Sequence, residues 1–261
     1  MFNTLTRKLV LILSCTVFLN LGNHYLVIAA TLEEIKERGK LIVAVKDNIR
    51  PLGFLDQENQ LQGLEIDLAK QLAQDILGDP QAIILQPVSN PERLQKVIDG
   101  EVDLAIARVT INASRRRLVS FSPYYYLDGT GIITNNPRIR ALDHLSASKI
   151  AVIERSSTIA VIREQLPQAQ LIGVKSYQEA MTLLEREQVA AFAADNSILT
   201  GWVQQYPQYY RLPVRLSGEA LGVVMPKGLQ YASLRSRINQ AIGRWKASGW
   251  LAELLERWGL P

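Results

Sequence analysis

Hydrophobic and polar positions follow two different periods along most of the chain. From residue 40 onward, short runs of apolar residues are followed by longer stretches in which apolar residues recur every three or four positions. The short runs predict buried strands, and the periodic stretches predict amphipathic helices. Strands that alternate with helices indicate an α/β architecture with mostly parallel sheets.

The first series of elements predicts one doubly wound unit. A strand is expected over 41–45, and the helix after it has an aliphatic residue at every fourth position, namely Leu64, Leu68, Leu72 and Ile76. Further strands are predicted over 82–88 and 102–107. Asn90 is expected to cap the helix between them, with Gly100 ending it.

A second series begins after Gly131 and repeats the same rhythm. Its expected strands cover 150–153, 171–174 and 189–194, and its first helix covers 157–166. Ser176 and Glu179 form a capping box ahead of a second helix. A strand over 221–225 and two helices, near 230–246 and 249–258, complete the chain.

Single strands near 131–134 and 219–225 separate the two series. The chain is therefore expected to build one lobe, cross to a second and return. We place lobe 1 at 38–130 plus 219–261, and lobe 2 at 131–218.

The N-terminal segment 1–30 has the layout of a secretory signal peptide. Arg7 and Lys8 precede an apolar run over 9–19, and the segment ends in small residues at Ala29 and Ala30. Cleavage near Ala30 is the expected outcome. Two alternatives stay open, an uncleaved anchor over 9–30 and a lipoprotein modified at Cys15.

The amino-acid composition argues against a disulfide, a metal site and a nucleic-acid partner. Cys15 is the only cysteine, so removal of the leader leaves no disulfide, and with His144 as the one remaining histidine no Cys/His metal site is expected. The net charge of +4 falls to +2 without the leader's two basic residues. A chain so near neutrality, with one dense basic cluster at 115–117, argues against a nucleic-acid partner. No cofactor is expected.

Five segments carry a more specific pattern. They read GLEIDLA over 63–69, DGEVDLA over 99–105, TINASR over 110–115, FSPYY over 121–125 and ADNSIL over 194–199. In sequence and order they resemble family 3 of the extracellular solute-binding proteins, the polar amino-acid group. The resemblance implies a type II periplasmic-binding-protein fold, in which a two-strand hinge joins doubly wound lobes. It also implies a monomeric periplasmic protein that passes an acidic or amide amino acid to the permease of an ABC importer.

The resemblance implies a ligand site at the carboxyl ends of the strands, where open α/β sheets place their ligands. Arg115 stands at the family's carboxylate-binding arginine, whose planar guanidinium can hold both oxygens, and Thr110 assists it. Asp195 corresponds to the ammonium-binding carboxylate. Ser157 and Thr158 stand in a turn that contacts the ligand carboxylate. Without the family pattern, Arg115 reads as a solvated charge, and Asp195 and Ser157 read as helix caps.

Ligand selectivity is predicted from long basic side chains. Lys46, Arg93 and Arg108 together would form a cationic pocket for glutamate or aspartate, although each alone reads more readily as a surface or interlobe charge. Arg108 stands where the family often has a small residue. Phe54 is expected to pack on the aliphatic stem of the ligand. Glu154 is expected either to hold a basic or amide side chain or to pair with one of these arginines.

A rival interpretation from another class is an exported cyclohexadienyl dehydratase, because the same fold also hosts this enzyme. Glu154 is then the candidate acid or base, but one cleft carboxylate is a weak catalytic signal. No catalytic residue is assigned, and the chain is expected not to be an enzyme. An isolated sensory domain is a third, less favoured alternative.

Overall fold

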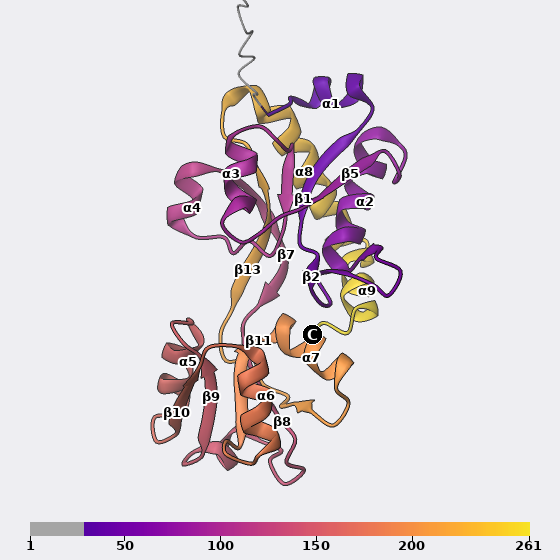
Figure 1. Cartoon of the computed structure of the whole chain (residues 1–261). Helices are drawn as coiled ribbons and strands as arrows, with labels where there is room; N and C mark the ends of the chain where they lie inside the picture. Colours follow the sequence, from indigo (N-terminus) through magenta and orange to yellow (C-terminus); the bar gives the residue numbers. More distant parts are fainter. Residues whose placement is uncertain (1–28) are drawn as a thin grey trace, which may run out of the picture.

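The chain is divided between two five-stranded sheets (Figure 1). The computed structural model describes residues 29–261. The leader expected over 1–30, with Cys15 and the alternative anchor over 9–30, therefore lies outside the described residues except for its last two positions. The first sheet has the strand order β5-β1-β6-β13-β7, and the second has the order β10-β9-β11-β8-β12.

The first lobe is the part built on the first sheet. Its strands are β1 (Leu41–Val45), β5 (Ile83–Pro87), β6 (Leu104–Ile106), β7 (Ser120–Asp128) and β13 (Glu219–Met225). Strand β1 pairs in parallel with β5 and β6, whereas β13 runs antiparallel to β6 and β7. Its helices are α1 (Leu32–Arg38), α2 (Leu64–Leu77), α3 (Glu92–Ile98), α4 (Ala113–Leu118), α8 (Ala232–Ala247) and α9 (Trp250–Arg257).

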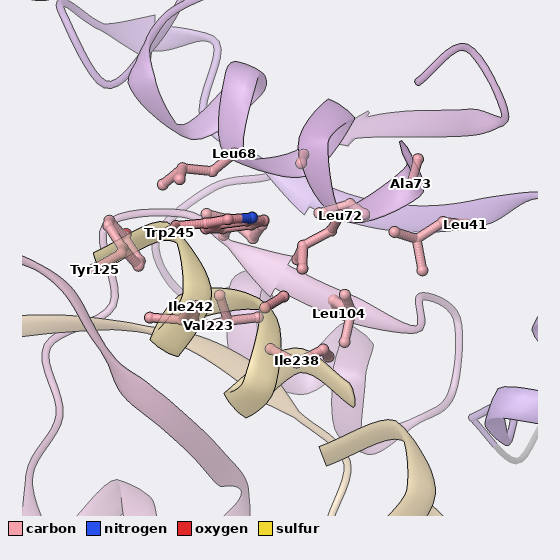
Figure 2. Packing of buried hydrophobic residues seen from close by; sticks show 14 of the residues in the cluster. Leu41, Leu68, Leu72, Ala73, Leu104, Tyr125, Val223, Ile238, Ile242 and Trp245 are labelled. Carbon is pink, nitrogen blue, oxygen red and sulfur yellow. The ribbon is translucent and has the colours of Figure 1, made fainter. Parts of the chain in front are cut away.

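The four-residue repeat in α2 explains how this lobe is held together. Leu68 and Leu72 are almost fully buried, because positions four apart share one face of a helix. They belong to one buried cluster with Ile242 and Trp245 of α8 (Figure 2). Helix α2 ends at Gly78, which adopts a left-handed conformation with φ of 79° and caps the last turn.

The second lobe is the part built on the second sheet. Its strands are β8 (Thr130–Thr134), β9 (Lys149–Ile153), β10 (Gln170–Val174), β11 (Ala191–Asp195) and β12 (Tyr210–Arg211). Its helices are α5 (Thr158–Gln165), α6 (Tyr177–Glu185) and α7 (Asn196–Gln205). Strand β9 pairs in parallel with β10 and β11. Buried clusters separate from those of the first lobe fill this unit, so each lobe has its own core. No helix within residues 29–261 is long and apolar enough to span a membrane.

Two chain crossings lie side by side between the lobes. The first runs from β7 through Gly129 to β8, and the second leads into β13. Thr130 donates a backbone hydrogen bond to the hydroxyl of Ser217 at 2.9 Å, and the N–H of Leu216 donates to the Thr130 carbonyl at 2.9 Å. A Cβ atom at Gly129 would lie 2.0 Å from the Ser217 carbonyl oxygen, so only glycine permits this approach without displacement. The crossings therefore form the two-strand hinge.

A small sheet that the hydrophobic pattern did not predict fills the connection between β1 and α2. It consists of β2 (Asn48–Ile49), β3 (Gly53–Leu55) and β4 (Leu61–Gln62). The N–H groups of Leu64 and Glu65 donate to the carbonyls of Pro51 and Leu52, at 2.9 and 2.8 Å. These bonds hold the loop against the first turn of α2.

The capping prediction at Asn90 is wrong. Pro91 occupies the N-cap position of α3, and no side chain caps this helix. Instead, the side chain of Glu92 accepts a 2.8 Å hydrogen bond from the N–H of Ser89. A glutamate in the first turn that reaches back satisfies a backbone donor just ahead of the helix, which leaves Asn90 without a capping role. Helix α6 is capped by Ser176, which accepts from the Glu179 N–H at 3.1 Å. The predicted capping box is not closed, because the Glu179 carboxylate accepts from the N–H of Lys175 at 2.7 Å and not from that of Ser176.

Candidate functional site

A cavity of about 670 Å³ lies between the two lobes. The first lobe contributes the loop after β1 and the small sheet, and the second contributes α6 and α7. Three of the predicted site residues line it, namely Lys46, Phe54 and Arg108. The cavity is therefore bounded by the carboxyl ends of first-lobe strands on one side and by helices of the other lobe on the opposite side.

The backbone of Arg108 is held from two directions. Its N–H donates to Glu65 Oε1 at 2.7 Å, and its carbonyl accepts from Arg93 Nη1 at 2.5 Å. Arg108 has a φ of 51°, a left-handed conformation that costs a non-glycine residue about 1 kcal/mol. Arg93 also donates to the Ala107 carbonyl at 2.9 Å. Arg93 thus supports the chain beneath the cleft, a contact that sequence reasoning did not anticipate.

The side chain of Arg108 forms an ion pair with Asp195 of the second lobe. Both side chains are about one-fifth exposed, at 20% and 21%. Asp195 ends β11 and occupies the N-cap position of α7, but its side chain makes no capping hydrogen bond. Its carboxylate therefore faces a guanidinium of the opposite lobe and does not serve the helix.

Arg115 lies on the short helix α4, which the hydrophobic pattern did not predict. Asn112 caps this helix by accepting from the Arg115 N–H at 2.9 Å. The Nη1 of Arg115 donates to the backbone carbonyl of Thr110 at 2.8 Å, so the two residues are in contact. The side chain of Arg115 is half-buried, in contrast to the exposed Arg116 and Arg117 beside it.

Four basic residues and a buried glutamate form one charged cluster on the first lobe. Burial lowers the pKa of Arg93, and the neighbouring Arg115 and Arg108 lower it further. Burial also lowers the pKa of Lys46, which is 4% exposed and donates to a backbone carbonyl at 2.6 Å. Glu65 lies fully buried beneath them, and burial raises its pKa despite its hydrogen bonds. The cluster is rich in donors and net positive.

The second lobe presents polar groups at the edge where β9 and β11 end. Glu154 follows β9, is exposed, and makes no ion pair with any of the described residues. Thr158 is buried at the start of α5. The hydroxyl of Ser157 donates to the Glu219 carboxylate on the hinge strand at 3.2 Å. The structure thus pairs Arg108 of the basic cluster with Asp195, whereas the other three cations of the cluster contact backbone carbonyls of the first lobe. It shows no contact between this pair and Glu154, Ser157 or Thr158.

Aromatic residues line the rest of the cavity. Phe54 is packed edge-on against Trp258 with ring centroids 5.9 Å apart, and the guanidinium of Arg50 lies 3.6 Å over its ring. Trp202 and Tyr177 come from the opposite lobe. Trp202 is mostly buried, yet it also faces the cavity. Its position seven residues after Asp195, two turns along α7, is the signal that could have identified it.

Two lobes with separate cores, a paired-strand hinge and opposite charges facing one cleft define the class of hinged solute-binding proteins. The chain belongs to the bacterial extracellular solute-binding proteins, family 3, whose family model matches residues 41–261. This finding confirms the resemblance carried by the sequence motifs and the type II fold that it implied.

Two relatives and one solved structure illustrate the similarity. The ABC transporter glutamine-binding protein GlnH of Bacillus subtilis (strain 168) is 29% identical over 231 residues, which cover 87% of this chain and 84% of that protein. The glutamine-binding protein of Geobacillus stearothermophilus is 35% identical over 196 residues, covering 74% and 75%. The structure of the Ancestral Cationic Amino Acid Solute Binding Protein (AncCDT-1) has a TM-score of 0.73 at 25% identity, covering 88% of this chain and 99% of that one. The two relatives are named for binding and not for catalysis, which favours a binding protein over the dehydratase alternative.

Proposed function

We propose that this protein captures a polar L-amino acid, acidic or amide, between its lobes and presents it to the permease of an ABC importer. The observation that carries the proposal is the placement of Arg115 on the first lobe and Asp195 on the second, around one charged cluster. A free amino acid has a carboxylate at one end of its backbone and an ammonium beside it. Groups of opposite charge on opposite lobes can therefore both reach it only when the cleft is closed.

Arg115 has the capacity to hold the ligand carboxylate. One of its guanidinium nitrogens donates to the Thr110 carbonyl at 2.8 Å. A guanidinium has five N–H donors in a planar fork, so further donors are left for a carboxylate. Thr110 supports this arginine, and Ser157 and Thr158 at the start of α5 are proposed to contact the same carboxylate from the other lobe. Asp195 is proposed to bind the ammonium.

The charge of the cleft favours an acidic or amide ligand over a basic one. Lys46, Arg93 and Arg108 add positive charge beside Arg115, and repulsion between like charges disfavours a lysine or arginine side chain. The relatives GlnH and the Geobacillus protein are named for glutamine, in agreement with an amide side chain. AncCDT-1 is named for cationic amino acids, so similarity of fold alone does not decide the ligand.

The proposal also assigns ligand contacts to the walls of the cavity and boundaries to the two lobes. Phe54 is proposed to pack against the aliphatic stem of the ligand, since it lines the cavity. Glu154, exposed at the edge of the second lobe, is proposed to contact an amide side chain when the cleft closes. The lobe boundaries are proposed at 38–130 plus 219–261 and at 131–218.

Export is part of the same proposal. The leader over 1–30 would direct the chain to the periplasm, where the protein would act as a monomer with a membrane permease as its partner. Modification of Cys15 remains the alternative route to the membrane surface. Mass spectrometry of the protein isolated from the cell envelope distinguishes them, because cleavage near Ala30 removes Cys15, whereas lipidation makes it the first residue.

Isothermal titration calorimetry with glutamate, aspartate and glutamine tests the proposed function. We expect at least one of them to bind the wild type, and Arg115→Ala to weaken that binding about 30-fold or more, the effect of removing one partner of a buried charge pair. Arg117→Ala is the matched control, because Arg117 is an exposed arginine on the same helix. Normal binding by Arg115→Ala, or binding confined to lysine and arginine, would contradict the proposal.

A further inference from the structure

The ion pair between Arg108 and Asp195 occupies the place that the proposed function assigns to the ammonium group of the ligand. It joins the lobes directly across the cleft. Within residues 29–261, Asp195 is the only carboxylate paired with Arg108. A ligand ammonium that binds the Oδ2 atom of Asp195 therefore has to displace the guanidinium.

Arg108 differs from the other cations of the cluster in the partner that it holds. Lys46, Arg93 and Arg115 each donate to a backbone carbonyl of their own lobe. Only Arg108, among these four, pairs with a group on the second lobe. Among these four cations, Arg108 is thus the one that loses its ion-pair partner when the cleft opens or when a ligand binds Asp195.

The surroundings of Arg108 make a free guanidinium unfavourable. Three cations lie in the same cluster, and the side chain is only 20% exposed, so water cannot fully replace the lost carboxylate. Its Nε is already buried without a hydrogen-bond partner among the described residues. The guanidinium lines the same cavity as Lys46, so an anion bound there lies within its reach.

We propose that Arg108 is a specificity-determining residue, whose guanidinium exchanges the carboxylate of Asp195 for the side-chain carboxylate of the ligand. In the ligand-free protein it pairs with Asp195. When an amino acid binds, its ammonium takes over Asp195, and the guanidinium turns to the side-chain carboxylate of the ligand. An acidic side chain restores the lost ion pair, whereas an amide leaves the guanidinium without a counter-charge. This inference rests on the proposed function and narrows its ligand from acidic or amide to acidic.

Calorimetry with glutamate and glutamine on the wild type and on two variants tests the exchange. The wild type is expected to prefer glutamate by about tenfold or more, since charge-assisted hydrogen bonds are roughly twice as strong as neutral ones. Arg108→Gln keeps a polar side chain but loses the charge, and should bring the two dissociation constants to within about threefold of each other. Arg108→Lys retains the charge and should retain the preference for glutamate.

The outcomes distinguish failure of the carboxylate exchange from failure of the proposed function. A wild type that binds both ligands equally, or an Arg108→Gln variant that keeps the full preference for glutamate, would overturn the exchange while leaving the proposed function intact. A wild type that binds no amino acid would overturn the proposed function, and the exchange with it. Circular dichroism checks that each variant is folded, and if Arg108→Gln does not fold, loss of the glutamate preference in the charge-retaining Arg108→Lys would overturn the exchange.

Discussion

Replacing Gly201 by alanine tests whether the ligand is held with the lobes in contact, as they are in this structure. Gly201 lies on α7 of the second lobe, and a Cβ atom there would stand 2.1 Å from the carbonyl oxygen of Arg50 in the first lobe. Contacts of a Cβ atom closer than 3.0 Å essentially never occur. The lobes must therefore move apart by about 1 Å, or the backbone must distort.

The expected loss of affinity follows from the cost of this overlap, because the ligand-free variant can relieve it by opening the cleft, whereas the closed complex cannot. Inserting one methyl group into a well-packed contact costs about 1 to 3 kcal/mol. Because about 1.4 kcal/mol corresponds to a tenfold change in binding, the dissociation constant for the amino acid should rise about 5- to 150-fold. The fold of the second lobe should not suffer, since alanine is about 1 kcal/mol more favourable than glycine inside a helix.

Isothermal titration with the best-binding amino acid measures the effect, and Gly243→Ala provides the matched control. Gly243 is also a helical glycine, in the middle of α8, but a Cβ atom there would meet nothing within 4 Å. The control should bind as the wild type does and unfold at an equal or higher temperature. If Gly201→Ala also binds with wild-type affinity, the ligand is held in a more open arrangement and the reasoning is refuted.

Three further predictions concern stability. Leu72→Ala removes a fully buried side chain of the first core and should lower the free energy of unfolding by about 2 to 5 kcal/mol in urea denaturation; a loss below about 1 kcal/mol would contradict the packing described. Gly129→Ala should cost about 1 to 3 kcal/mol, because its Cβ would lie 2.0 Å from the Ser217 carbonyl oxygen. Gly218→Ala on the other crossing, where the nearest atom is at 3.5 Å, should be close to neutral in the same experiment. Burial raises the pKa of Glu65, so the folded protein keeps the proton of this carboxyl group at pH values where the unfolded chain has lost it. The contribution of Glu65 to stability is therefore full below the pKa of the unfolded chain and is lost as the pH rises through the pKa of the folded protein. The unfolding temperature of Glu65→Gln relative to the wild type should therefore shift in favour of the variant as the pH rises above about 4, the ordinary pKa of glutamate, and an unchanged difference would count against a raised pKa.

The main elements of both lobes could be predicted from the sequence because their periodicity is strong. The apolar run over 41–45 is β1 with the same bounds, and the repeat that begins at Leu64 is α2. Helix α4 and the small sheet were missed because they contain few residues and no apolar repeat. Helix α4 is stabilised by its Asn112 cap, and the loop of the small sheet is held by backbone hydrogen bonds from α2. Neither kind of interaction produces a hydrophobic pattern in the sequence.

The candidate site was only partly accessible from the sequence. The contact between Arg115 and Thr110 is local, within five residues, and both residues belong to one motif that the sequence shows. The ion pair of Arg108 with Asp195 joins residues 87 positions apart on different lobes, so it depends on how the lobes meet. Glu65 belongs to the first quoted motif, but its role in holding the Arg108 backbone becomes apparent only when α2 is placed beneath β6.

A crystal structure of the protein with bound glutamate tests the central claim most directly. We predict that the ligand lies between the lobes, with its α-carboxylate on the guanidinium of Arg115 and its ammonium on the carboxylate of Asp195. A glutamate molecule bound with neither residue within hydrogen-bond distance would contradict the account.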